Sequence, residues 1–172
     1  TTAEVNAFYD AREVPGDPRP ISHGLNSRLV KVDGKIVEQV YKVDGLYGEA
    51  LKVIIGHLEA AAEVAENDLQ KRYIAELIEY YKTGDLHIWD RYNVSWVSDV
   101  DSDIDFINGF VEDYSDPLGR KATYEGIVQY RDKEASRRTE IISENAQWFE
   151  DNSPVDPRFK KAEVKGVSAK VI

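Results

Sequence analysis

The sequence lacks cysteine and methionine entirely, although it is 172 residues long. Without cysteine the chain can form neither a disulfide framework nor a thiolate zinc site by itself. It also lacks any apolar run near the roughly 20 residues that a membrane-spanning helix needs, so we predict no membrane partner. Because the sequence begins with Thr-Thr and has no initiator methionine, we expect a fragment of a longer polypeptide. The absence of a signal peptide therefore carries little weight.

Acidic residues outnumber basic ones, and no strongly basic patch is present in the sequence. The formal net charge is −10, from 22 basic and 32 acidic residues. The densest basic cluster is Arg137-Arg138, and Glu134 and Glu140 flank it. A chain with this balance repels a phosphate backbone, so we predict no nucleic-acid partner. Apolar residues make up 42% of the chain and include ten tyrosines, which is typical of a folded domain rather than a disordered one.

Motifs of self-sufficient enzymes are absent too. The three histidines, at positions 23, 57 and 87, form neither an HExxH motif nor a pair four residues apart. No nucleophile elbow and no glycine-rich phosphate loop occurs in the sequence. We therefore predict no metal ligands in this chain, and motif logic does not predict an enzyme that is complete by itself.

The first half of the chain predicts a hairpin and three helices. A proline-rich segment, residues 14–20, separates a short N-terminal helix from two β-rich runs joined by Asp33-Gly34, the dipeptide typical of a tight hairpin turn. From Leu46 the apolar residues repeat with helical period, and Thr83-Gly84 and Asp85 predict the end of one helix and the start of the next. Short connections predict that the three helices pack as neighbours.

The second half predicts a strand, a long helix and a terminal strand. Residues 103–114 are rich in aromatic and β-branched residues, and the sequence DPLG that follows predicts a tight turn. We predict that Thr123 caps a helix that runs to about Asn152 and that residues 162–172 form a last strand. The predicted fold class is therefore α+β: a β-hairpin and a central strand with a three-helix cluster, followed by a long connecting helix.

The stretch DVDSDID, residues 99–105, resembles the start of a calcium-binding loop. Counted from Asp101, carboxylates fall at positions 1, 3 and 5, and Glu112 falls at position 12. Position 6 of such a loop must be glycine for a sharp turn, but here it is Phe106. We therefore interpret Asp99, Asp101 and Asp103 as solvated loop and capping residues, and keep a calcium-stabilised structural domain only as an alternative.

Glu112 and Tyr114 form a more informative pair. Alternate residues of a strand share a face, so these two side chains are predicted to project together, about 7 Å apart along the chain. A carboxylate beside a phenol can recognise a ligand that has a cation and a carbonyl group. The alternative interpretation is structural: an acid on an edge strand and a half-buried tyrosine.

The segment NGFVEDYSDPLGRKATYEGIV, residues 108–128, resembles the dipeptidyl peptidase III family. In that family a glycine-phenylalanine strand carries a Glu-x-Tyr pair and is followed by an Asp-Pro-x-Gly turn and an aromatic-Glu pair. The runs GLNSRLVK, GLYGEALKVII and IEYYKTGDL resemble the bacterial branch of the same family. The resemblance covers most of the chain.

This resemblance implies a two-lobed, cytoplasmic zinc exopeptidase that removes dipeptides from the N-terminus of oligopeptides. The zinc of such enzymes is held by an HExxGH helix and a glutamate from a later helix, beyond the region matched here. The resemblance implies that Glu112 binds the α-ammonium group of the substrate and that Tyr114 donates its hydroxyl to the scissile carbonyl as it becomes an oxyanion. It also implies a further contact in the cleft for Glu125. It thus implies substrate-binding residues but no zinc site, and a chain that is inactive alone.

The resemblance also predicts how the chain is divided. Residues 1–123 would belong to the lobe with the β-core, and residues 124–172 would be the connecting helix and the start of the zinc lobe. The partners implied are an oligopeptide substrate and the remainder of the parent polypeptide. The alternative is a non-catalytic binding or interaction module that retains the lobe. An HExxGH motif encoded after residue 172 would favour the enzyme fragment, and a stop codon there would favour the module.

Overall fold

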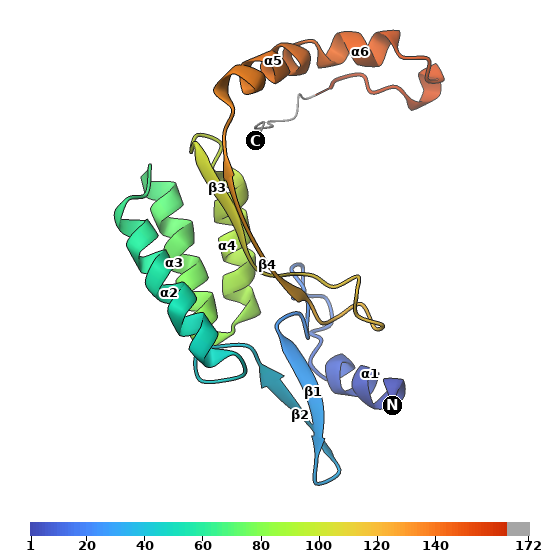
Figure 1. The fold of residues 1–172 in the computed structure, drawn as a ribbon. Helices are drawn as coiled ribbons and strands as arrows, with labels where there is room; N and C mark the ends of the chain where they lie inside the picture. Colours follow the sequence, from blue (N-terminus) through green and yellow to red (C-terminus); the bar gives the residue numbers. More distant parts are fainter. Residues whose placement is uncertain (165–172) are drawn as a thin grey trace. The chain divides into compact units, whose positions relative to one another are not determined.

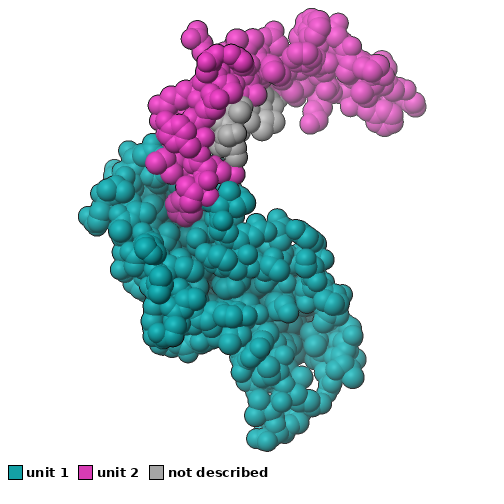
Figure 2. Space-filling view, in the orientation of Figure 1, with its two compact units in different colours: residues 1–102, 107–127 teal, residues 103–106, 128–172 magenta. Residues whose placement is uncertain are grey.

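The computed structural model describes residues 1–164 (Figure 1). The chain divides into two compact units (Figure 2): unit 1 comprises residues 1–102 and 107–127, and unit 2 comprises residues 103–106 and the segment from 128 onward. The described residues contain, in chain order, α1 (Thr2–Asp10), β1 (Ser27–Val32), β2 (Lys35–Val40), α2 (Gly48–Glu63), α3 (Asp68–Thr83), α4 (Leu86–Ser98), β3 (Ile104–Glu112), β4 (Thr123–Tyr130), α5 (Lys133–Glu144), α6 (Ala146–Asn152) and a short 3₁₀ turn (Pro157–Phe159).

The predicted hairpin is confirmed. Strands β1 and β2 pair antiparallel with Val32 opposite Lys35, so only Asp33 and Gly34 form the turn. Both turn residues have positive φ, 47° and 78°, as the tight turns that match strand twist require. Asparagine, aspartate and glycine adopt this conformation most readily, which explains why this dipeptide joins the strands.

The three predicted helices α2, α3 and α4 also form and pack as neighbours, with α3 in contact with both of the others. Asn67 caps the start of α3 by accepting from the Gln70 N–H, and Gly84 ends it with φ 74°. Asp85 then caps α4 by accepting from the His87 N–H. The core of unit 1 centres on α3, where the most deeply buried side chains are Tyr73, Ile74, Leu77, Tyr80 and Tyr81.

Strands β3 and β4 form the second two-stranded sheet. They run in opposite directions, because the Arg131 N–H, just after β4, donates to the Asp103 carbonyl, just before β3. At the other end the Thr123 hydroxyl donates to the Glu112 carbonyl. Strand β3 packs on the helices of unit 1 through two residues: the Tyr81 hydroxyl donates to the Asn108 amide oxygen at 2.5 Å, and Gly109 lies against the Trp89 ring.

The long helix predicted from Thr123 to Asn152 is wrong at its start. Residues 123–130 form β4, and helical structure begins only at Lys133, where the Asp132 carboxylate caps α5 by accepting from the Ala135 N–H. The sequence TYEGIVQY is rich in aromatic and β-branched residues, which favour a strand beside β3 over an isolated helix. The helical segment is further divided at Asn145 into α5 and α6, and it ends at Asn152 as predicted.

The fold class α+β is confirmed. The predicted terminal strand falls mainly on residues 165–172, which lie outside the described residues, and residues 162–164 form no regular element. Within residues 1–164, no helix combines the length and the apolar character needed to cross a bilayer. The assignment of residues 1–123 and 124–172 to two lobes of a larger enzyme stays a prediction.

Candidate functional site

Glu112 is the last residue of β3, and its side chain is half-buried. Its carbonyl accepts a hydrogen bond from the Thr123 hydroxyl at 3.2 Å, which joins the end of β3 to the start of β4. The Glu112 carboxylate has no hydrogen bond or ion pair with any residue in 1–164. A partly desolvated carboxylate without a partner can receive a cationic ligand group without first breaking an ion pair.

The structure places Tyr114 differently from the sequence prediction. Strand β3 ends at Glu112, so Tyr114 lies in the following turn and not on the same strand face. The turn begins where the Asp113 carbonyl accepts from the Asp116 N–H at 2.9 Å. The Tyr114 side chain is 78% exposed. Its phenol is therefore available to a ligand, but the alternation rule does not align it with Glu112.

Asp116 organises the turn that carries Tyr114. Its carboxylate accepts hydrogen bonds from three backbone N–H groups, those of Leu118, Arg120 and Lys121, at 3.1–3.3 Å. The Gly119 N–H donates to the Asp116 carbonyl at 2.9 Å, and Gly119 has φ 58°. The predicted Asp-Pro-x-Gly turn is thus confirmed. Sequence reasoning recognised the turn but missed that the side chain of its first residue fixes the backbone as far as Lys121.

Glu125 lies on β4 and is half-buried, two residues after Thr123. Two residues of a strand span about 7 Å, so the hairpin brings Glu125 to the same end of the sheet as Glu112. Like that of Glu112, its carboxylate has no hydrogen bond or ion pair with another residue in 1–164. The site therefore offers two uncompensated carboxylates and an exposed phenol, which are groups that can recognise an ammonium and a carbonyl.

Two of the three aspartates before β3 hold the local structure together, whereas the sequence predicted solvated loop and capping residues. Asp99 is half-buried and accepts from the Asp101 and Ser102 N–H groups at 3.2 Å, and the Ser102 hydroxyl donates to its other oxygen at 2.5 Å. Asn67, the cap of α3, donates to the same serine hydroxyl at 2.8 Å. Asp103 forms an ion pair with Lys133 at 2.5 Å. Of the three aspartates, Asp101 alone is an exposed lead-in residue. Within residues 1–164, no three His, Asp or Glu side chains gather as metal ligands.

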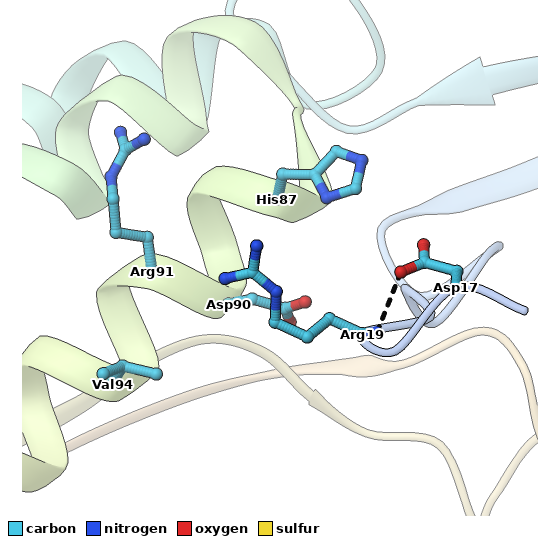
Figure 3. Close-up of a pocket in the computed structure, with 6 residues that line it drawn as sticks. All are labelled: Asp17, Arg19, His87, Asp90, Arg91 and Val94. Atoms are coloured by element: carbon cyan, nitrogen blue, oxygen red, sulfur yellow. Dashed lines mark hydrogen bonds between the residues drawn. The ribbon is translucent and has the colours of Figure 1, made fainter.

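A polar cavity of about 490 Å³ lies elsewhere in unit 1, between α4 and the proline-rich segment (Figure 3). Its lining contains both acidic and basic side chains: Asp17 and Asp90, and Arg19, His87 and Arg91. Burial raises the pKa of Asp90, while the charges of His87 and Arg19 oppose that rise. Arg91 already pairs with Glu76 and Glu79 on α3. This cavity contains none of the predicted site residues.

Comparison with known proteins links the chain to one family. The sequence profile described as Peptidase family M49 matches residues 25–166, a segment that includes Glu112, Tyr114 and Glu125. Among curated relatives, dipeptidyl peptidase 3 of Rattus norvegicus is 29% identical over 117 residues, which are 68% of this chain and 16% of that protein. Dipeptidyl peptidase 3 of Dictyostelium discoideum is 27% identical over 129 residues, or 75% of this chain and 18% of that protein.

Solved structures give a matching result. The structure of DPP III from Caldithrix abyssi superimposes with a TM-score of 0.74 and 25% identity, over 95% of this chain and 30% of that one. Dipeptidyl-peptidase III from Corallococcus sp. strain EGB shares the fold with a TM-score of 0.63. The chain thus spans about a sixth of the length of the curated relatives and less than a third of the solved ones.

Proposed function

The chain belongs to peptidase family M49, and from this premise we propose that it is a fragment of a dipeptidyl peptidase III-like zinc hydrolase that releases dipeptides from the N-terminus of oligopeptides. The single observation that carries the proposal is the family match across residues 25–166, which includes the hairpin with Glu112 and Glu125. The relatives that match are mainly dipeptidyl peptidases and are much longer than this chain, which supports a parent polypeptide with further segments.

In this proposal Glu112 binds the α-ammonium group of the substrate. The uncompensated, half-buried carboxylate supports this role, because a charge-assisted hydrogen bond is strongest where neither partner is already paired. A carboxylate that holds the amino terminus also fixes which peptide bond reaches the reaction centre, since two extended residues span at most about 7 Å. Glu125, at the same end of the sheet, would contact the peptide further along.

Tyr114 would donate its hydroxyl to the scissile carbonyl as negative charge develops on the oxygen. Its exposure in the turn ordered by Asp116 supports access to a substrate. Because the ring is 78% exposed, the substrate and the remainder of the parent polypeptide would have to hold it in place during the reaction.

The family implies zinc, and the residues described here do not fit it. Metallopeptidases hold catalytic zinc with three protein ligands, and within residues 1–164 no such group of His, Asp or Glu side chains exists. We therefore place the zinc ligands and the general base in the remainder of the parent polypeptide and derive no step through the metal. This chain alone would bind substrate and be inactive. We further propose a cytoplasmic parent that has no nucleic-acid or membrane partner.

The experiment compares peptides with free and acetylated amino termini. In the parent enzyme we expect Glu112→Gln to weaken the binding of a free peptide about tenfold or more, because one charge-assisted contact is lost, and to leave the acetylated peptide unchanged. Glu63→Gln, at an exposed position on α2, is the matched control and should change neither. Inhibition constants measured by competition would show this. An equal effect of Glu112→Gln on both peptides would refute the ammonium role.

A further inference from the structure

A second cavity in unit 1, of about 440 Å³, is lined by four aromatic rings, those of Tyr41, Tyr47, Phe110 and Tyr124. We name these four residues the aromatic cup. It lies where the start of α2 meets β3 and the start of β4, and Leu51 and Ile54 of α2 complete its apolar wall. None of the residues with predicted roles in the peptidase reaction lines it.

The rings of the aromatic cup are arranged as a floor and two walls. Tyr41 and Phe110 pack together with ring centroids 4.8 Å apart and are only 4% and 5% exposed. Tyr47 packs on Tyr41 at 5.1 Å, and Tyr124 packs edge-on against Phe110 at 5.6 Å, yet these two rings are 55% and 42% exposed. Exposed rings that flank a buried aromatic floor form a concave apolar site of the kind that takes a flat apolar group.

Tyr47 is held in the aromatic cup by a strained backbone. Its φ is 63° and its ψ is 15°, a left-handed conformation that costs a non-glycine residue of order 1–3 kcal/mol. Tyr47 is the N-cap residue of α2, and its carbonyl accepts from the Leu51 N–H at 3.0 Å, but its side chain makes no capping hydrogen bond. Such outliers concentrate at binding and catalytic sites, where the surrounding structure maintains them. In this conformation the Tyr47 side chain is free of the helix end and its ring packs on Tyr41, beside the cavity.

Among residues 1–164, Lys121 is the one charged residue that lines the cavity. Its backbone N–H donates to the Asp116 carboxylate, which fixes its position in the turn. Within residues 1–164 its ammonium group has no ion pair or hydrogen bond, although the chain carries ten more acidic than basic residues. A lysine without an ion pair in the lining of an aromatic cavity favours a ligand that joins an apolar group to an anion, and it disfavours a cationic ligand.

We propose that the aromatic cup binds the C-terminal aromatic residue of a peptide, with the aromatic side chain against Phe110 and Tyr47 and the terminal carboxylate on Lys121. A C-terminal phenylalanine or tyrosine carries both required groups on one residue. The cavity volume exceeds that of a single aromatic side chain and leaves room for the backbone of the preceding residue. This site does not depend on the ammonium contact at Glu112, so the proposal stands apart from the proposed peptidase function.

The test uses the 172-residue chain and peptides with a blocked amino terminus, which removes any contact with Glu112. N-acetyl-glycyl-phenylalanine should bind saturably in a calorimetric titration, about tenfold more tightly than its C-terminal amide, because only the acid pairs with Lys121. It should also bind more tightly than N-acetylphenylalanine, which lacks the preceding residue. Equal binding of acid and amide would refute the role of Lys121. Tighter binding of phenyltrimethylammonium would show a cation site instead.

Two variants separate the parts of the site. Lys121→Met should reduce the affinity for the acid to that for the amide, whereas Lys35→Met, at an exposed hairpin position, should change neither. Tyr47→Gly should abolish binding of both peptides without loss of the fold, because glycine adopts the positive φ without strain. Its circular dichroism spectrum and thermal transition monitor the fold. Wild-type affinity in a folded Tyr47→Gly variant would overturn the proposal.

Discussion

Replacement of Gly109 by alanine tests how β3, the strand that ends at Glu112, is held against the helices. A Cβ at position 109 would lie 2.5 Å and 2.8 Å from two carbon atoms of the Trp89 ring, well inside van der Waals contact. Trp89 is 8% exposed and packs against Tyr80 at 4.9 Å and Tyr92 at 5.1 Å, so it has no free space into which to turn.

The expected size of the effect follows from two opposing contributions. Over-packing of a filled core costs about 1–3 kcal/mol. Replacing glycine by alanine in a strand recovers about 0.5–1 kcal/mol of backbone entropy. We therefore expect Gly109→Ala to lower the free energy of unfolding by about 1–2 kcal/mol.

Urea unfolding followed by tryptophan fluorescence measures the change, with Gly56→Ala as the matched control. Gly56 is exposed within α2, and no heavy atom lies within 4 Å of the position that an added Cβ would take. Alanine there should raise the free energy of unfolding by about 1 kcal/mol through helix propensity. A Gly109→Ala variant as stable as the wild type, or more stable, would refute the close contact between β3 and α4.

Two further predictions concern Tyr114 and Glu4. In the parent enzyme, Tyr114→Phe should lower kcat with little change in KM, because an oxyanion donor acts mainly in the transition state; a change in KM alone would contradict this role. Hydrogen bonds from Lys31 and the amino terminus lower the pKa of Glu4 to about 2, so its contribution to stability is present above about pH 4.5 and is lost as the pH falls through 2. An NMR titration that gives Glu4 a pKa near 4.5 would contradict these contacts.

The first half of the fold could be predicted because its signals are local. Asp33-Gly34 adopts positive φ angles readily, and Gly84 and Asp85 end one helix and start the next within three residues. Each of these turns and helix ends depends on the backbone conformation at one or two positions. The helices could be predicted from the 3.6-residue repeat of apolar residues, because α3 buries one continuous face.

Strand β4 could not be predicted in the same way. Residues 123–130 contain apolar side chains that fit both a helical and a strand pattern, and the choice depends on pairing with β3. That pairing is a contact between segments that a sequence pattern does not reveal. The aromatic residues of TYEGIVQY and the cap at Asp132 were the available signals, and they favoured a strand followed by a later helix start.

The placement of the candidate site residues differs in part from the sequence prediction. Glu112 lies on a strand as predicted, but the strand ends there, and Tyr114 belongs to a turn fixed by Asp116. The aromatic cup was missed because Tyr41 and Tyr47 lie far from Phe110 and Tyr124 in the sequence, and the two pairs meet only in the folded chain. The roles of Glu112, Tyr114 and Glu125 in a peptidase stay predictions.

The most direct test of the central claim is product analysis of the parent enzyme by mass spectrometry. An oligopeptide with a free amino terminus and its acetylated form are incubated with the purified parent, and the released fragments are identified. The proposal predicts N-terminal dipeptides from the free peptide and little or no cleavage of the acetylated one. Release of single residues or internal fragments, or equal cleavage of both peptides, would contradict it.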